Sequence, residues 1–336
     1  MVMGDLPQET DVLVIGGGPG GYVAALRAAS FGKKVMLVEK ERLGGMCLHY
    51  GCIPSKTLIH VANFLDDAKH AKDMGLDFKV SVDLERLRTW KQSVIDRLTK
   101  GIEHLCQKRG VNVVTGTAEF ESPGRALIHL ADGKQGVEFA KAIIATGSSP
   151  VEIPGLPFTH PKIWNARKAL AISEIPKRLA VVGAGYIGLE LGFCYAKMGS
   201  AVTMVEGLPA FLPQGDADAR KLLEKNLKAH GMDLLLDAKV NGFAEKDGIT
   251  LQTSKGDVAA DAVLVAVGNR PNTKIGLEKA GVKLDAKGFI ATNASMQTNQ
   301  PNIYAIGDVR GAPLLAHKAF LEGKVAGEHA CGQKSA

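Results

Sequence analysis

The chain has 336 residues, of which 46% are hydrophobic and 39 are glycines, which favours a two-domain α/β protein with many tight turns. Its formal net charge of +6 is spread along the chain and only 5% of the residues are aromatic, so the sequence does not support nucleic-acid binding. Five cysteines, an odd number, argue against a secreted disulfide framework.

The N-terminal segment carries no recognisable targeting signal. Residues 1–11 are acidic where a signal peptide would be basic, and they lack the arginines of a transit peptide. The uncharged run at 12–26 is short and rich in glycine, so we expect no membrane span. The sequence therefore predicts a cytoplasmic protein, in which a pair of cysteines is more often catalytic than structural.

Residues 11–40, DVLVIGGGPGGYVAALRAASFGKKVMLVEK, have the pattern of a dinucleotide-binding unit. An apolar run leads into GxGxxG at Gly16, Gly18 and Gly21, and a helix of small residues and a second apolar run follow before Glu39. Such glycines let the backbone approach a pyrophosphate at a helix N-terminus, and the acid accepts hydrogen bonds from a ribose.

The next stretch, GGMCLHYGCIPSK, places Cys47 and Cys52 five positions apart. On a regular helix these Cα atoms would lie roughly 8.6 Å apart, too far for a disulfide, so the pair can bond only across a distorted turn. Gly51 permits that distortion, and Pro54 indicates that a helix begins around Cys52.

The spacing of Cys47 and Cys52 does not by itself decide the chemistry of the pair. A metal site would show CxxC and further ligands, which this stretch lacks, and no metal is predicted. A cysteine at a helix start, one turn before Lys56, has its thiolate favoured. The alternative is two reduced cysteines in a core. Ordinary thiols are expected at Cys106, Cys194 and Cys331.

Residues 178–207 repeat the first unit at the same spacing, with Gly183, Gly185 and Gly188 as its glycines and Glu206 as its acid. Two copies in full strand–turn–helix–strand context are much stronger evidence than one. Glu206 would repel a 2′-phosphate, and no Arg or Lys stands beside it, so we expect NAD rather than NADP.

Three more apolar runs, at 141–150, 261–272 and 298–311, predict buried strands that end in glycine turns. Small antiparallel pieces are expected around 110–130 and 249–258. The predicted fold class is α/β, with two Rossmann-like dinucleotide-binding domains in three layers and small antiparallel crossover sheets. The second domain, 149–278, is inserted between the two parts of the first, 1–148 and 279–336.

These motifs together resemble the flavin-dependent pyridine nucleotide–disulfide oxidoreductases, and within them the dihydrolipoamide dehydrogenases. The matching segments follow the family's order over nearly the whole chain: VIGGGPGGYVAALRAA, GGMCLHYGCIPSK, AIIATGSSP, VVGAGYIGLELG, VGNRPNT, YAIGDV and LLAHKA. The resemblance implies FAD in the first unit, NAD in the second, and transfer of electrons from dihydrolipoyl thiols to NAD⁺. The alternative is an FAD/NAD-binding fragment with NADH:acceptor (diaphorase) activity only, or with no turnover.

The resemblance also implies roles for individual residues. Cys52 is expected to lie next to the flavin and Cys47 to meet the substrate, while Lys56, paired with Glu190, stands near flavin N5. Glu190 could otherwise be a first-turn residue that complements its helix dipole. The FAD residues are Gly16, Gly18, Gly21, Glu39, Lys40, Gly45, Lys56, Ala118, Thr146, Gly147, Asp308 and Ala316; the NAD residues are Gly183, Gly185, Tyr186, Ile187, Gly188, Glu206 and Gly268.

The sequence departs from the family pattern in three places, the first of which is Met46 where the family usually has Thr. His49 and Tyr50 replace the common Asn-Val, and we interpret His49 as a local substitution on an irregular turn. The family's C-terminal interface domain, with its His-Glu pair, has no counterpart after Asp308, so we expect a truncated, monomeric form of a native homodimer. Its expected partner is the lipoyl group of a 2-oxoacid dehydrogenase or glycine cleavage complex, with no nucleic acid and no membrane.

Overall fold

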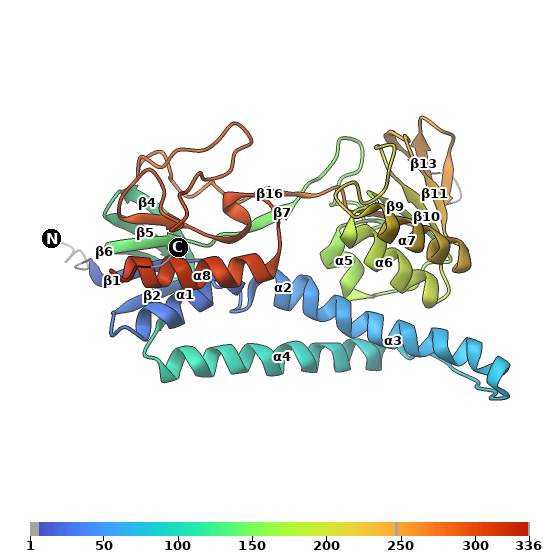
Figure 1. Cartoon of the computed structure of the whole chain (residues 1–336), viewed down its shortest axis with the longest axis horizontal. Coiled ribbons are helices and arrows are strands. Elements are labelled where there is room, and N and C mark those ends of the chain that lie inside the picture. The colour runs from blue at the N-terminus through green and yellow to red at the C-terminus, as the bar shows by residue number, and fades with distance from the viewer. Residues whose placement is uncertain (1–6, 246–247, 335–336) are drawn as a thin grey trace. The chain divides into compact units, whose positions relative to one another are not determined.

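The computed structural model describes residues 7–245 and 248–334 (Figure 1). Residues 1–6, part of the segment in which the sequence analysis expected no targeting signal, lie outside this range. The chain divides into two compact units. Unit 1 contains Met1–His49, Ile95–Ser149 and Arg270–Ala336, and unit 2 contains Tyr50–Val94 and Pro150–Asn269. Residues 50–94 thus group with unit 2, whereas the sequence-based division placed them in the first domain.

Unit 1 is built on a seven-stranded sheet with β3, β2, β1, β6, β5 and β4 in that order and β17 paired with β6. The neighbours from β3 to β6, and β17 with β6, are parallel, while β5 is antiparallel to β6 and to β4. The strands are β1 (Gln8–Ile15), β2 (Val35–Glu39), β3 (Asn112–Thr115), β4 (Thr117–Ser122), β5 (Arg125–Leu130), β6 (Gly133–Ile144) and β17 (Ile303–Ala305).

Helices α1 (Pro19–Ala29) and α8 (Ala316–Ala330) pack closely in unit 1. A Cβ at Gly323 would lie 2.5 Å from the Gly20 carbonyl oxygen, and one at Gly327 would lie 2.9 Å from the Ala24 carbonyl oxygen. Such approach is possible only because the facing residues are glycine or alanine. The small-residue pattern of the first dinucleotide unit is therefore also a helix-packing pattern.

Unit 2 contains a five-stranded, fully parallel sheet in the order β11-β10-β9-β15-β8. A separate antiparallel sheet has the order β12-β13-β14. The strands of both sheets are β8 (Ile163–Trp164), β9 (Arg178–Val182), β10 (Ala201–Val205), β11 (Asp233–Leu235), β12 (Val240–Glu245), β13 (Ile249–Thr253), β14 (Val258–Ala260) and β15 (Ala262–Val265). Its helices include α5 (Ala166–Ala171), α6 (Tyr186–Lys197) and α7 (Ala217–Ala229).

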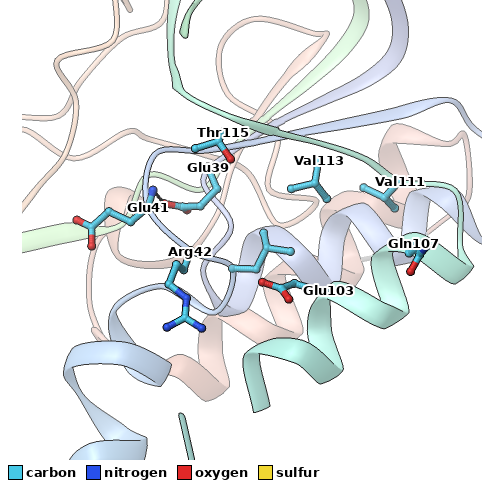
Figure 2. A pocket seen from close by; sticks show the side chains of 9 residues that line it. Glu39, Glu41, Arg42, Glu103, Gln107, Val111, Val113 and Thr115 are labelled. Atoms are coloured by element: carbon cyan, nitrogen blue, oxygen red, sulfur yellow. Dashed lines mark hydrogen bonds between the residues drawn. The ribbon is translucent and has the colours of Figure 1, made fainter. Parts of the chain in front are cut away.

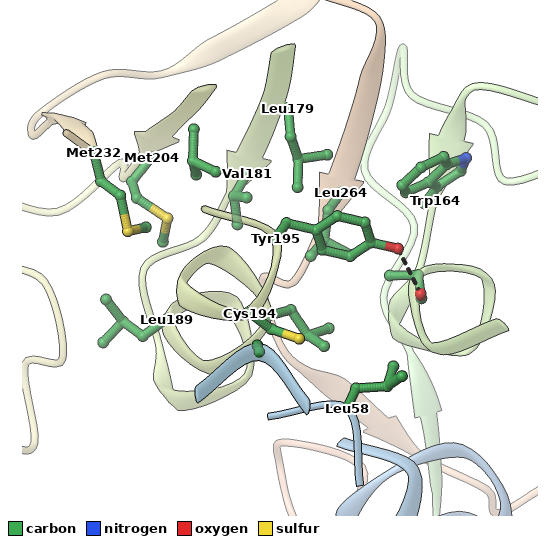
Figure 3. Close-up of a cluster of buried hydrophobic side chains, with 14 of the residues drawn as sticks. Leu58, Trp164, Leu179, Val181, Leu189, Cys194, Tyr195, Met204, Met232 and Leu264 are labelled. Atoms are coloured by element: carbon green, nitrogen blue, oxygen red, sulfur yellow. Dashed lines mark hydrogen bonds between the residues drawn. The ribbon is translucent and has the colours of Figure 1, made fainter. Parts of the chain in front are cut away.

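Helix α3 (Cys52–His70) joins unit 2 because its apolar face packs on α6. Figure 3 shows Leu58 of α3 in the same buried cluster as Cys194 and Tyr195 of α6. The buried Tyr195 hydroxyl donates to the Ala169 carbonyl oxygen at 2.7 Å, which avoids the cost of a buried polar group without a partner. This core fixes α3, and with it Cys52 and Lys56, to the parallel sheet of unit 2.

The remaining elements connect these parts. Helix α4 (Leu84–Lys108) contributes residues to both units, and β7 (Ser148–Pro150) and β16 (Asn269–Pro271), which pair with each other, carry the chain between them. Short helices are α2 (Gly45–Tyr50), η1 (Ala71–Met74) and η2 (Gly307–Arg310). No helix among the described residues is long and apolar enough to cross a membrane. The α/β fold with two Rossmann-type units and the small antiparallel pieces are confirmed.

Candidate functional site

The two neighbouring cysteines form a disulfide where α2 gives way to α3. Cys47 lies within α2, Cys52 is the first residue of α3, and both are disulfide-bonded. Gly51 between the helices has φ −144° and ψ −112°, outside both the helical and the extended regions. The predicted distortion at Gly51 and the predicted helix start at Cys52 are confirmed, which settles the choice between a disulfide and two reduced core cysteines.

The other cysteines are poor candidates for redox chemistry. Burial raises the pKa of Cys106 to about 11, with the Glu103 carboxylate acting in the same direction, and burial raises the pKa of Cys194 to about 12. Burial also raises the pKa of Cys331. Because the thiolate is the nucleophilic form, a raised pKa makes these thiols less nucleophilic near neutral pH than an ordinary cysteine.

His49 lies on α2 and not on an irregular turn, so that interpretation was wrong. Its Nε2 is 2.9 Å from the Leu43 carbonyl oxygen. Tyr50, in unit 2, is contacted by Arg167 of α5, whose guanidinium lies 3.7 Å from the ring centroid and donates to the hydroxyl at 2.8 Å. His49 and Tyr50, two of the residues that depart from the family pattern, therefore have defined contacts.

Lys56 and Glu190 are paired within unit 2. The Lys56 Nζ donates to both carboxylate oxygens of Glu190, at 2.8 and 2.9 Å. Glu190 is the fifth residue of α6, and no acidic residue occupies the first turn of that helix, so the helix-dipole explanation for Glu190 is wrong. The cation of this ion pair, Lys56, lies one helical turn after Cys52 on α3.

The two glycine turns have matching geometry. Gly16 and Gly183 have φ values of 104° and 97°, and a Cβ at either would lie 2.3 or 2.5 Å from the carbonyl oxygen of Ala145 or Ala266. Their amides donate to the carbonyl oxygens of Val38 in β2 and Val205 in β10, both at 2.8 Å. The first glycine of each motif is thus required by the fold itself.

The second glycine of each motif is not required by the fold. Gly18 and Gly185 have φ values of −70° and −77°, which any residue adopts. A Cβ at Gly18 would meet no atom nearer than 3.9 Å, and one at Gly185 would meet nothing within 4 Å. The space left at the N-termini of α1 and α6 fits a pyrophosphate against the backbone, as dinucleotide cofactors require.

The two acids also match each other. Glu39 accepts from the amides of Gly17 at 2.6 Å and Glu41 at 2.9 Å. Glu206 accepts from the amides of Ala184 at 2.7 Å and Leu208 at 3.0 Å. Each carboxylate is thereby held at the end of the second strand of its unit, beside its glycine turn.

A cavity of about 300 Å³ opens beside Glu39 in unit 1 (Figure 2). It lies between the ends of β2 and β3 and helix α4, and Arg42 at its side is paired with Asp96 at 2.9 Å. Its size and its carboxylate suit the adenosine part of a dinucleotide. It is lined by Glu39, Glu41, Arg42, Leu43, Glu103, Gln107, Val111, Val113 and Thr115.

Asp308, the first acid of η2, accepts a hydrogen bond from the Ser148 hydroxyl at 2.6 Å. Thr146, two residues before Ser148, donates from its hydroxyl to the carbonyl oxygen of Asn272 at 2.7 Å. The Asn272 side-chain amide in turn donates to the carbonyl oxygen of Thr146 at 2.9 Å. The sequence analysis missed Ser148 and Asn272. No local signal could have identified them, because their partners lie more than a hundred positions away.

The other predicted site residues lie as follows. A Cβ at Gly45 would be 2.5 Å from the Gly18 Cα, so the redox stretch begins against the first glycine turn. Ala118 is buried in β4 and Ala316 begins α8, while Tyr186 begins α6 with 47% exposure. Lys40 follows β2, Ile187 follows Tyr186, and Gly147 and Gly268 adopt positive φ values of 67° and 123°.

Comparisons with known proteins agree with this geometry. The family model described as "Pyridine nucleotide-disulphide oxidoreductase" matches residues 10–323. Dihydrolipoyl dehydrogenases of Bacillus subtilis and Haloferax volcanii are 45% and 44% identical to the chain, each over 99% of the chain and 72% of the relative.

Solved structures give the same result. LpdA from Mycobacterium tuberculosis superposes with a TM-score of 0.91 at 29% identity, over 97% of this chain and 73% of that one. The flavoprotein disulfide reductase RclA from Escherichia coli gives 0.86 at 27% identity, over 97% of this chain and 72% of that one. With its disulfide between two helices and its two matching nucleotide turns, the chain belongs to the pyridine nucleotide–disulphide oxidoreductase family.

Proposed function

We propose that the chain acts as a dihydrolipoyl dehydrogenase, with the net reaction dihydrolipoyl dithiol + NAD⁺ → lipoyl disulfide + NADH + H⁺. The observation that carries the proposal is the Cys47–Cys52 disulfide, positioned between α2 and α3 in a chain with two dinucleotide turns. The names of its relatives point to the same reaction.

Thiol–disulfide exchange is the first step. A substrate thiolate attacks Sγ of Cys47, the Cys47–Cys52 bond breaks, and Cys52 leaves as a thiolate. The second substrate thiol then attacks the substrate sulfur of the mixed disulfide and releases Cys47. The substrate loses two electrons and two protons: the cysteine pair gains the electrons, one proton goes to the Cys47 sulfur, and the other is released as the H⁺ of the net reaction. Lys56, one turn after Cys52, favours the thiolate form of the leaving sulfur.

FAD and NAD are the cofactors that these residues would hold. Gly16, Gly18 and Gly21 with Glu39 would bind the pyrophosphate and ribose of FAD, and Asp308 its ribityl chain. Gly183, Gly185 and Gly188 with Glu206 would bind NAD in the same way. When bound, FAD supplies the two-electron acceptor between the dithiol and the nicotinamide.

The remaining assignments follow the same division. Lys40, Gly45, Thr146, Gly147 and the backbone of Ala118 and Ala316 complete the proposed FAD site. Tyr186, Ile187 and Gly268 complete the NAD site. The Lys56–Glu190 pair would place a cation near the flavin, and its carboxylate would fix the lysine's position. The proposed partner is a lipoyl group carried by a 2-oxoacid dehydrogenase or glycine cleavage complex in the cytoplasm.

Two assays with one variant test the proposal. The FAD-saturated protein is assayed for NAD⁺ reduction by dihydrolipoamide, and separately for NADH oxidation by a dye. The Cys47→Ser variant should lose the first activity and keep the second, because the dye reaction needs no disulfide. Absence of the first activity in the unmodified protein, with the dye reaction intact, would favour the alternative of a diaphorase only.

A further inference from the structure

A buried ion cluster contacts the backbone of Gly307, the residue before Asp308. Glu322 of α8 is 4% exposed, and its Oε2 accepts a hydrogen bond from the Gly307 amide at 2.7 Å. Its Oε1 pairs with Arg310 and lies 3.6 Å from the Nζ of Lys318. All of these residues belong to unit 1. The sequence analysis assigned a role to Asp308 but none to Glu322, Arg310 or Lys318.

The cluster holds Gly307 from both sides. While Glu322 binds the amide of Gly307, Lys318, one turn earlier on α8, donates to the carbonyl oxygen of Gly307 at 3.2 Å. Lys318 also donates to the carbonyl oxygen of Gly311, at the far end of η2. One lysine–glutamate pair on α8 therefore fixes both peptide groups of Gly307 and the end of the short helix that carries Asp308.

Stability alone does not explain such a cluster. The side chains of Lys318 and Glu322 are only 13% and 6% exposed, and burial lowers the pKa of Lys318 against the opposing effect of the Glu322 carboxylate. Buried ion pairs recover little more than their desolvation cost, and apolar residues of similar volume often serve stability as well or better. Charged hydrogen bonds do fix the orientation of the groups that they join. Here they fix the orientation of the peptide groups on both sides of Gly307, and the second of these leads into Asp308.

We propose that Glu322 is a positioning residue for cofactor binding, which orients the Gly307–Asp308 peptide so that the Asp308 carboxylate meets the ribityl hydroxyls of FAD. Asp308 is further aligned by the Ser148 hydroxyl, so the turn is held from the α8 side by Glu322 and from the β7 side by Ser148. This inference rests on the proposed function, because it takes Asp308 as an FAD ligand.

The test is a double-mutant cycle in FAD affinity. Glu322→Gln keeps the side-chain shape but removes the charge that pairs with Arg310 and Lys318. It should weaken FAD binding about tenfold. Lys318→Met, which removes the contacts to both carbonyl oxygens, should act in the same direction. Affinity is measured in the full chain stripped of flavin, by the change in flavin fluorescence on titration, and the melting temperature of the flavin-free protein is recorded beside it.

The matched control lies on the same helix. Glu328 of α8 forms an ion pair with Arg27 of α1 at 2.6 Å, and Glu328→Gln should leave FAD affinity within about twofold of the unmodified protein. In the Asp308→Asn background, Glu322→Gln should cost little further affinity, because its effect is exerted through Asp308.

The outcomes separate the two proposals. If Asp308→Asn alone leaves FAD affinity unchanged, the assignment of Asp308 in the proposed function fails. If Asp308→Asn weakens FAD binding but Glu322→Gln has no effect, or adds its full loss in the double variant, the positioning role of Glu322 is overturned. The positioning role of Glu322 is supported if Glu322→Gln and Glu328→Gln lower the melting temperature of the flavin-free protein equally but only Glu322→Gln weakens FAD binding.

Discussion

Lys56 of α3 donates to both carboxylate oxygens of Glu190 on α6, at 2.8 and 2.9 Å. The lysine side chain is 60% exposed and the glutamate side chain 35%, so water screens the attraction. The pair therefore contributes little to stability, and its arrangement is better explained by the place of its cation next to the redox cysteines.

Replacement of Lys56 by Met should separate stability from chemistry. We expect the free energy of unfolding to change by less than about 1 kcal/mol, because the pair is exposed. The rate of flavin reduction by NADH should fall about 10- to 100-fold, because the cation that we propose to lie near the flavin is lost. Stopped-flow absorbance measures the rate and thermal unfolding the stability. Lys221→Met, which removes the exposed ion pair with Asp218, is the control and should change neither.

The cysteine pair should give a spectroscopic signature. If Cys52 is the sulfur next to the flavin, its thiolate should produce a long-wavelength charge-transfer band on mild reduction. Cys47→Ser should keep the band and Cys52→Ser should lose it. Identical titrations of both variants and the unmodified protein would refute the assignment of the two sulfurs.

Glu206 should determine coenzyme preference. Its carboxylate is held by the amides of Ala184 and Leu208, ready to accept from ribose hydroxyls and to repel a 2′-phosphate. Glu206→Arg should weaken NADH use and improve NADPH use, each by about 1–3 kcal/mol in kcat/KM. Equal kcat/KM for the two coenzymes in the unmodified protein would contradict the argument. Glu39→Arg, the same change in the other unit, should leave the ratio unchanged.

The glycine turns allow a sharper test, because only the second glycine is free of internal contacts. Gly18→Ala should leave the flavin-free protein within about 1 kcal/mol of its original stability, yet weaken FAD binding about 10- to 100-fold through overlap with the pyrophosphate. Gly185→Ala should do the same to NADH binding and spare FAD. Gly21→Ala, whose Cβ would lie 1.8 Å from the Gly16 carbonyl oxygen, should fail to fold. Unchanged cofactor affinity in Gly18→Ala and Gly185→Ala would rule out these cofactor positions.

Asp66 should make stability depend on pH. Burial acts to raise the pKa of Asp66, but the hydrogen bonds and charges of His230, at 3.2 Å, and Lys197, at 3.3 Å, outweigh it, so this pKa lies below its usual value. A lowered carboxyl pKa stabilises the fold above the unfolded-state value, near pH 4, and the gain is lost as the pH falls further.

Asp66→Asn should therefore lower the melting temperature at pH 7, and the difference from the unmodified protein should shrink below about pH 4. Asp67→Asn, an exposed neighbour on the same helix, should show no such dependence. If the difference in melting temperature between Asp66→Asn and the unmodified protein did not change with pH, the ionised carboxylate of Asp66 would not be the source of the stabilisation.

The sequence by itself determined the parts that depend on neighbouring residues. The two glycine turns, the acids at the ends of their second strands, and the helix start at Cys52 all follow from spacing, φ preferences and apolar periodicity over short segments. The distortion at Gly51 was predictable for the same reason, since the distance between i and i+5 on a helix is fixed by geometry.

Only the tertiary structure decided the contacts between distant segments. The grouping of residues 50–94 with unit 2, the Tyr50–Arg167 contact and the hydrogen bond from Ser148 to Asp308 join residues between which no local pattern exists. The same holds for Glu322, one of the two acidic residues of α8, which the packing of α8 brings to the Gly307 amide. Spacing along a helix or strand determines local conformation, whereas the choice of partner for a buried charge depends on how whole elements pack.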